Sequence, residues 1–422
     1  MFIAIPIVRR LSSKRDSDLS APLPPGRDQS RATPAGHGKR LARRNTSLVP
    51  VQLLLVLGGL ASGFMIWVAL DSHTYSDFAF VYDSAAAFHE GRSLYVSAIT
   101  RPGWHNMNPP HFIALMAPLA WLPIRSAMIL WWIVTGVAML ACVRMWQRWL
   151  PPGWALALFA LLMASAAGYL NIRAANQTWV FAAIVTAGWS AWREGSARRA
   201  AAILGFAASI KLFLLIVLPY LAWRRRWGAV ASFVGAIAVA VATGIGICGL
   251  GAYAAWLRGL SDQTWQGSPL SMSMLGGLTR AFDAYSSAAI VDAPRVITPF
   301  WVAITAGLGL VLYGGLRREH TDRDFAALLV AMLLITPAGW IYYIPLFAGP
   351  AAATLARSRS SWLWIASVLA LLVPYPFVAA ASGSPLVLLS LGSIYLWGGV
   401  ALLAAILLTN NDGVAAPSDA VV

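Results

Sequence analysis

Charged residues are scarce in this sequence. Only 11% of the 422 residues are charged, 59% are hydrophobic, and the mean hydropathy is +0.67. Soluble domains carry about 25% charged residues, so this composition excludes an ordinary soluble enzyme. Apolar runs long enough to cross a hydrocarbon layer of about 30 Å recur along the whole chain. These runs do not alternate with polar residues, which favours a bundle of membrane helices over a transmembrane barrel.

Cysteine and the common cofactor motifs are almost absent as well. The two cysteines, Cys142 and Cys248, lie inside apolar runs, which leaves no disulfide framework and no thiolate metal site. The sequence has no Walker loop, no GxGxxG after a strand, no GxSxG and no CxxC. ATP-driven transport and redox chemistry with a soluble cofactor therefore lose support.

Histidine is also too sparsely spaced to indicate a metal site. Four of the six histidines fall in the first polar loop, namely His73, His89, His105 and His111. The HxxxH and HxH spacings that zinc ligands favour are missing, so we expect no metal and no other cofactor. We interpret His105 and His111 as residues that bind an acceptor or a phosphate.

Acidic residues number 16 against 31 lysines and arginines, which gives a net charge of +15. Residues 1–48 hold ten of these cations, and most of the others form short patches between apolar runs. That distribution follows the positive-inside rule, with anionic membrane lipids as the partner, and we expect no binding to nucleic acid. We predict that residues 1–48 are a disordered cytoplasmic tail.

The pattern of apolar runs predicts one membrane domain over residues 49–409 and a short flexible tail over 410–422. We expect an all-α polytopic protein with roughly ten to thirteen transmembrane or re-entrant helices. The first span is 49–70, which starts in the cytoplasm and delivers a loop with amphipathic helices, 71–110, to the outer face. Residues 111–122 are too short to span, and 251–295 form a second outer loop. The other predicted spans are 124–146, 153–170, 177–192, 229–250, 296–316, 325–340, 342–356, 361–381 and 385–408.

Lys211 interrupts the apolar stretch 200–223, which has arginines near both ends. We predict two short helices that meet at Lys211, each of about eleven residues and about 16 Å. Half-length helices at membrane depth are tolerated where they line a cavity. An intramembrane cation indicates function by default, and a lipid phosphate would suit Lys211, although a lysine that snorkels to the interface is the alternative. Arg173 is the other cation nearest to membrane depth.

The carboxylates lie outside the centres of the apolar runs. Asp77 begins a run in which Phe78, Val81, Tyr82 and Ala85 are spaced for burial on a helix. Asp77 is therefore either a catalytic carboxylate next to the membrane or simply the N-terminal cap of that helix.

Several short motifs follow one another between residues 50 and 410. They are Asp77-Phe78, Leu94-Tyr95, Asn108-Pro109-Pro110, Asn176-Gln177, the stretch 205–211 that ends at Lys211, the stretch 267–280, and Thr336-Pro337-x-Gly339-Trp340-x-x-Tyr343. Together they resemble glycosyltransferase family 87, which comprises polyprenyl-phosphate-mannose-dependent mannosyltransferases and their relatives. The sequence departs from the family pattern at Tyr342, where members have His, at Leu212, where they have Pro, and in 267–280, which lacks an Asn.

The resemblance implies a GT-C fold with its active site at the outer face of a bacterial cytoplasmic membrane. It implies a polyprenyl-phospho-sugar donor and a carboxylate base, which is Asp77 by its position in the motif. Lys211 and Arg173 would bind the donor phosphate. The residues expected to line the substrate site are His105, Asn108, His111, Gln177, Trp340, Tyr342 and Tyr343.

We therefore predict an inverting transferase that moves a hexose, mannose by resemblance, from a polyprenyl-phosphate carrier to a glycan, lipid or protein acceptor. One base and one cation suffice for this reaction because the donor already carries a good leaving group. The alternative from another class is a lipid or lipid-linked-sugar flippase, which would be expected to show repeat symmetry. A further alternative is an inactive family member that only binds lipid.

Overall fold

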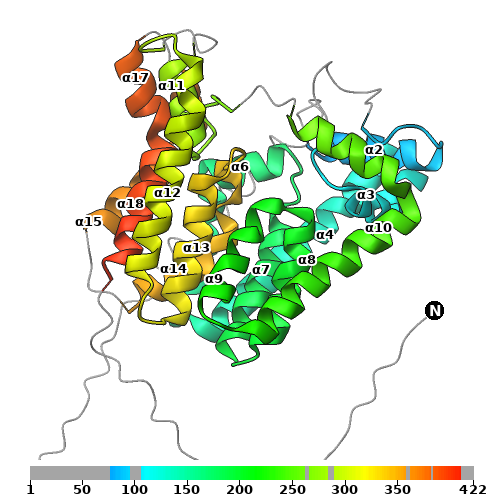
Figure 1. Ribbon diagram of the computed structural model, residues 1–422, viewed down its shortest axis with the longest axis horizontal. Helices are drawn as coiled ribbons and strands as arrows, with labels where there is room; N and C mark the ends of the chain where they lie inside the picture. The colour runs from blue at the N-terminus through cyan, green and yellow to red at the C-terminus, as the bar shows by residue number, and fades with distance from the viewer. Residues whose placement is uncertain are drawn as a thin grey trace, which may run out of the picture. The chain divides into compact units, whose positions relative to one another are not determined.

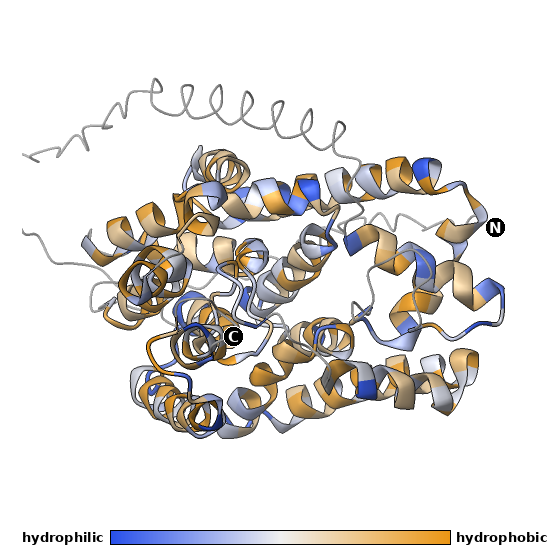
Figure 2. Ribbon diagram, turned by 90° about the horizontal axis from the view of Figure 1, so that it is seen from above, coloured by the Kyte–Doolittle hydropathy of each residue, from blue (hydrophilic) through white to orange (hydrophobic). Residues whose placement is uncertain are grey.

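The structure is a computed structural model that describes residues 77–95, 106–261, 266–283, 289–357, 362–381 and 384–409. These residues all belong to one compact unit, Leu48–Val422. The predicted tails 1–48 and 410–422, the predicted span 49–70, His73 and His105 lie outside the described residues. Within the described part the secondary structure is helical, as the sequence predicts, and hydrophobic residues dominate most helices (Figures 1 and 2).

Four described helices are long and apolar enough to cross a membrane, or five if one bent pair counts as a span. The chain is thus an all-α polytopic membrane protein. The four candidates are α4 (Ile124–Trp149), α10 (Trp227–Ser261), the segment formed by η3 (Pro294–Val296) and α12 (Ile297–Gly315), and the segment Pro385–Leu407. The last comprises α17 (Pro385–Ser390), η5 (Leu391–Ser393) and α18 (Ile394–Leu407).

The predicted span 153–170 is not one straight helix. The chain forms α5 (Trp154–Ala164) and α6 (Ala166–Arg173), which are bent by 68°. Ser165 stands at the bend, where its Oγ donates to the Leu162 carbonyl at 2.6 Å and accepts from the Gly168 amide at 3.3 Å. A side chain at Gly168 would place its Cβ 2.4 Å from the Leu162 carbonyl oxygen, so the bend requires a glycine there.

Shorter helices complete the described part of the bundle. They are α7 (Thr178–Arg193), α8 (Ala197–Ile210), η2 (Leu212–Ile216), α9 (Val217–Trp223), α13 (Thr321–Ile335), η4 (Ile341–Tyr343), α14 (Pro345–Leu355), α15 (Trp362–Leu372) and α16 (Tyr375–Ala379). Helix α8 packs against α7 and α10, and α13 packs against α14 and α18. The predicted pair of short helices around Lys211 is present, because α8 ends at Ile210 and η2 starts at Leu212.

The two loops predicted to face outward contain further helices. Helix α2 (Asp77–His89) packs on α3 (Pro110–Met116) and on η1 (Ala117–Trp121), and α11 (Met274–Phe282) packs on α12. The second loop begins later than predicted, because α10 continues to Ser261 after a break at Gly249. Gly249 has φ 78° and ψ 161°, a conformation that only glycine adopts without strain.

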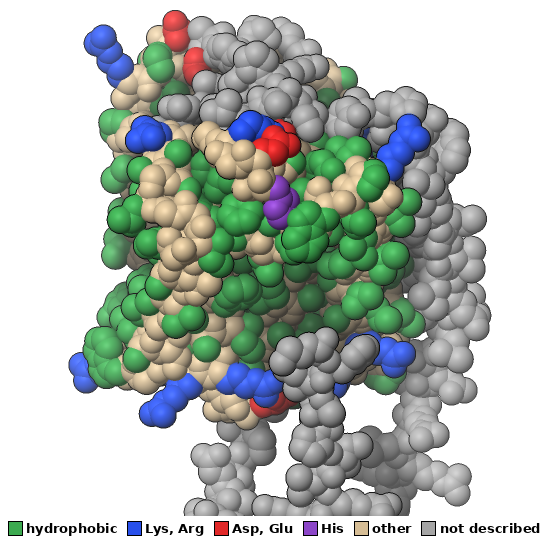
Figure 3. Space-filling model, turned by 90° about the vertical axis from the view of Figure 1, so that its right-hand side faces the viewer, with side chains coloured by type: hydrophobic (Ala, Val, Ile, Leu, Met, Phe, Trp, Pro, Cys, Tyr) green, Lys and Arg blue, Asp and Glu red, His purple; other side chains and the backbone are tan. Residues whose placement is uncertain are grey.

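Arginines gather at the end of the bundle opposite to Lys211. Asp322 and Asp324, in the first turn of α13, pair with Arg193 at 3.5 Å and with Arg224 at 3.0 Å, respectively. Arg357, just after α14, also pairs with Asp322. These ion pairs join the ends of α7, α9 and α14 to the start of α13. Figure 3 shows charged side chains along two edges of the molecule with an apolar belt between them.

The lengths of α8 and α13 set the depth at which Lys211 and Thr336, at the ends of these helices, lie. Helix α8, with 14 residues, and α13, with 15, are about 21–23 Å long. Both are shorter than a hydrocarbon layer of about 30 Å. If the arginine end lies at one interface, Lys211 and Thr336 therefore lie inside the layer, nearer to the opposite face.

Candidate active site

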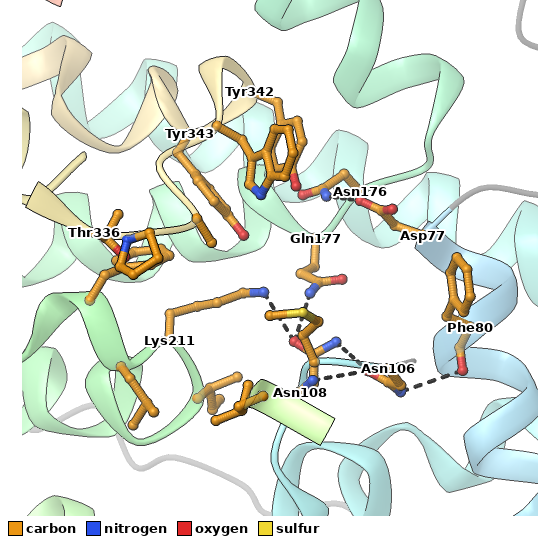
Figure 4. A pocket seen from close by; sticks show the side chains of 18 of the residues that line it. Asp77, Phe80, Asn106, Asn108, Asn176, Gln177, Lys211, Thr336, Tyr342 and Tyr343 are labelled. Atoms are coloured by element: carbon orange, nitrogen blue, oxygen red, sulfur yellow. Dashed lines mark hydrogen bonds between the residues drawn. The ribbon is translucent and has the colours of Figure 1, made fainter. Parts of the chain in front are cut away.

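A cavity of about 490 Å³ opens where these helix ends meet. Asp77 and Lys211 lie on opposite sides of it, with Asn108 and Gln177 between them (Figure 4). The other lining residues are Phe80, Asn106, Met107, Asn176, Ile210, Leu212, Phe213, Trp256, Leu260, Gln266, Thr336, Pro337, Ala338, Trp340, Tyr342 and Tyr343. Segments far apart in the sequence therefore build one polar site with apolar walls.

Asp77 is held at the first turn of α2. Its carboxylate accepts a hydrogen bond from Asn176 Nδ2, and the Phe78 amide donates to the Ala174 carbonyl at 3.4 Å. Asn176 Oδ1 in turn accepts from the amide and the hydroxyl of Thr178, at 2.8 and 2.6 Å. These two bonds orient the Asn176 amide so that its NH₂ group points at Asp77.

The chain reaches Asn176 through an unusual conformation at Ala175, whose φ is 43°. A left-handed residue other than glycine costs about 1–2 kcal/mol. The Ala175 carbonyl accepts a hydrogen bond from Trp131 Nε1 at 2.9 Å, which fixes the turn between α6 and α7. Strain of this kind, held in place by neighbours, is common at functional sites.

Lys211 occupies the break between α8 and η2, with φ −118° and ψ 91°. Its Nζ donates to Asn108 Oδ1 at 3.1 Å and lies 5.6 Å from the Phe181 ring and 5.7 Å from the Tyr343 ring. An ammonium group has three donors, so two of them can serve a bound ligand.

Asn108 connects the two sides of the cavity. Its Oδ1 accepts from Gln177 Nε2 at 2.8 Å as well as from Lys211. Its own side-chain NH₂ donates to Asn106 Oδ1 at 2.9 Å, and Asn106 Nδ2 donates to Ser84 Oγ at 2.9 Å. This chain of amides fixes the position of Lys211 relative to α2, which carries Asp77.

The aromatic rings of Trp340, Tyr342 and Tyr343 form another wall of the cavity. Trp340 stacks on Tyr342 with ring centres 6.0 Å apart and planes 11° apart. Tyr342 meets Tyr343 edge to face at 4.7 Å, and Tyr343 meets Phe213 at 4.9 Å. Flat apolar faces beside amide and carboxylate groups suit a sugar, which has both apolar and hydroxyl surfaces.

Burial raises the pKa of the Asp77 carboxyl above its usual value of 3.8. The hydrogen bond from Asn176 and the positive charge of Lys211 oppose this shift in part. A carboxylate with a raised pKa is a stronger base than one in water.

Seven of the predicted site residues line the cavity, namely Asp77, Lys211, Asn108, Gln177, Trp340, Tyr342 and Tyr343. His111 does not line it, because its ring bridges Tyr253 Oη at 2.9 Å and Ser209 Oγ at 3.1 Å. That histidine ties α3 to α10 and α8. The roles assigned to the seven residues stay predictions.

Arg173 does not line the cavity either. It is exposed at the end of α6, and its Nη1 donates to the hydroxyl of Tyr169 at 3.2 Å. This placement gives its predicted role in phosphate binding no support.

Sequence reasoning missed several residues of the site, among them Asn106, Asn176, Trp256 and Gln266. Asn176 had a visible signal, since it stands beside Gln177 directly before the apolar run 177–192. Trp256 had none, because only the break at Gly249 carries the end of α10 to the cavity. Within the described residues no group of three or more His, Cys, Asp or Glu side chains could hold a metal ion.

An apolar groove of about 720 Å³ adjoins the cavity. The two share Leu212, Phe213, Thr336 and Pro337 in their walls. From there the groove runs between α9, α12 and α13, along Trp223, Trp301, Gly309, Leu312, Tyr313 and Leu316.

The sequence matches the profile of glycosyltransferase family 87 over residues 106–338, more than half of the chain. No curated protein and no solved structure matches it. The matched region contains Asn108, Asn176, Gln177 and Lys211, and its end at residue 338 includes Thr336 and Pro337 of the cavity wall. The chain belongs to glycosyltransferase family 87 and is a glycosyltransferase of the membrane.

Proposed function

We propose that this enzyme transfers a hexose, mannose by family resemblance, from a polyprenyl-phosphate carrier to an acceptor hydroxyl, with inversion and in a GT-C fold. One observation carries the proposal: a carboxylate and an ammonium group face a single cavity, and that cavity adjoins an apolar groove. The carboxylate supplies a base, the ammonium a phosphate ligand, and the groove a place for the isoprenoid chain.

In the proposed reaction the acceptor oxygen attacks the anomeric carbon of the donor while Asp77 accepts the hydroxyl proton. The bond between that carbon and the phosphate oxygen breaks, and polyprenyl phosphate leaves with the electron pair. Lys211 stabilises the negative charge that develops on the leaving phosphate. No strong general acid and no metal are needed, because phosphate is a good leaving group and Lys211 supplies the cation.

The groove supports a lipid carrier in two ways. It starts at Leu212 and Phe213, directly beside Lys211, so a phosphate on Lys211 would have its alkyl chain at the mouth of the groove. It then follows α12, whose 19 residues are about 28 Å long, nearly the thickness of the hydrocarbon layer.

We further propose that the cavity faces the outside of a bacterial cytoplasmic membrane. Arg193, Arg224 and Arg357 gather at the opposite end of the bundle, and the positive-inside rule favours the cytoplasm for that end.

Replacing Asp77 by asparagine tests the base. We expect kcat to fall by about 10²–10⁴-fold in purified enzyme given donor and acceptor lipids, because proton transfer contributes that much. Glu90→Gln is the matched control, since Glu90 is exposed just beyond the same helix. Turnover close to wild type in Asp77→Asn would remove Asp77 from this role. Movement of the donor between leaflets without a new glycoside would instead identify a flippase.

A bulky side chain in the groove tests whether the groove binds the isoprenoid chain of the carrier. Gly309 lines the groove and a side chain there would meet open space, so Gly309→Trp should block the isoprenoid chain. We expect KM to rise for a long-chain donor and to stay unchanged for a donor with one or two isoprene units. Gly307→Trp, on the same helix but outside the groove wall, is the control. Equal effects on both donors would contradict a carrier in this groove.

A further inference from the structure

Arg280 is a buried cation that the proposed reaction does not use. It lies on α11, is 1% exposed, and does not line the cavity in the part of the chain that the structure describes. Its Nε donates to Ser393 Oγ at 2.8 Å, and its Nη1 and Nη2 donate to the carbonyls of Ser268 and Ser271 at 2.8 and 3.4 Å. One guanidinium thus joins α11, the turn 268–271 and η5.

The turn that Arg280 holds is tightly built. The Ser271 amide donates to the Ser268 carbonyl at 2.9 Å, and the Ser271 and Ser273 hydroxyls are 2.9 Å apart. Ser273 caps α11 by accepting from the Gly276 amide at 2.9 Å. Ser271 and Ser273 are both buried, so the turn forms part of the protein interior.

Backbone hydrogen bonds connect the turn 268–272 to the segment that carries the aromatic wall of the cavity. The Met272 amide donates to the Gly339 carbonyl at 2.6 Å, and the Ile341 amide donates to the Leu270 carbonyl at 3.0 Å. Ser271 and Trp340 form an antiparallel bridge between these two bonds. Trp340 then stacks on Tyr342, which contacts Tyr343.

We propose that Arg280 is a positioning residue: through the turn 268–272 it holds Trp340, Tyr342 and Tyr343 at the distance from Lys211 that donor binding requires. This proposal rests on the proposed function, because it takes the sugar donor to be the ligand that contacts Trp340, Tyr342 and Tyr343. The planar guanidinium reaches three acceptors in two different segments at once, which the single ammonium of a lysine does not reproduce.

Arg280→Lys tests this role because it keeps the positive charge and removes the planar guanidinium with its several N–H donors. We expect faster hydrogen exchange in the peptides that cover 268–273 and 338–343, but not in the peptides of α7. We also expect the donor KM to rise about tenfold, with kcat and the acceptor KM nearly unchanged. Ser393→Ala removes one acceptor of the Arg280 guanidinium and should produce smaller changes in the same direction. It serves as the test variant if Arg280→Lys does not fold. Arg295→Gln, an exposed arginine on η3, is the control and should change neither quantity.

Two results would overturn the proposal. One is unchanged exchange at 268–273 and 338–343 in both Arg280→Lys and Ser393→Ala. The other is a loss of folded enzyme and of kcat with an unaltered donor KM, which marks a purely structural arginine. If wild-type enzyme transfers no sugar from a polyprenyl-phosphate donor, the proposed function fails, and the exchange data alone decide whether Arg280 holds the wall.

Discussion

Replacing Lys211 by methionine removes the only cation among the described residues that line the cavity, and it keeps a side chain of similar size. In the structure its Nζ contacts Asn108 Oδ1 at 3.1 Å and lies among the Phe181 and Tyr343 rings. Water is therefore partly replaced around the ammonium, which strengthens its interaction with a bound anion.

The size of the effect follows from that environment. A unit charge 4 Å from an opposite charge gains about 4 kcal/mol at an effective dielectric constant of about 20, which corresponds to about 10³-fold in rate. Removing one stabilising donor from other active sites lowers kcat by about 10²–10³-fold. We therefore expect kcat/KM to fall by about 10²–10³-fold in Lys211→Met.

The assay is single-turnover transfer from a polyprenyl-phosphate sugar in detergent or nanodiscs, with thermal unfolding measured in parallel. Stability should stay the same or rise, because a buried charge costs free energy that methionine does not. Arg173→Met is the matched control, since it removes an exposed cation outside the cavity. A loss of less than tenfold in folded Lys211→Met would refute Lys211 as the phosphate ligand.

Four further predictions follow from the structure. The acid limb of kcat/KM against pH should have its midpoint above 3.8, because burial raises the pKa of Asp77 and the base must be ionised to act. Asn176→Ala should move that limb to still higher pH by removing a hydrogen bond that lowers the pKa, and a limb that stays in place would contradict Asp77 as the titrating base. Gly249→Ala should destabilise the protein by about 1–3 kcal/mol in thermal unfolding, whereas Gly246→Ala, on the same helix without a positive φ, should not. Chelation with EDTA should leave transfer unchanged, and activity that is lost and then restored by a divalent cation would show that Lys211 is not sufficient.

The sequence was enough to predict an all-α membrane protein, because long apolar runs must form helices in lipid. It also predicted the helix that begins at Asp77, the short segment 111–122 and the break at Lys211. Each of these depends on a local signal: a carboxylate before an apolar face, a Leu-Pro stop, and a charge in the middle of an apolar run.

Other features could not be predicted in this way. The bend at Ser165 depends on the close approach of Gly168 to Leu162. The return of α10 over the cavity depends on the conformation of a single glycine, Gly249. Both interrupt apolar stretches whose composition resembles that of a continuous span.

The sequence alone predicted the family, glycosyltransferase family 87, and the membrane location. Both predictions depend on apolar runs and short motifs, which are patterns among neighbouring residues. Which polar residues share the cavity was decided only by tertiary structure. Asn176 meets Asp77 across 99 positions, and Asn108 meets Lys211 across 103. Contacts at such separations depend on how whole helices pack and end, and packing is set by many side chains at once rather than by any local pattern.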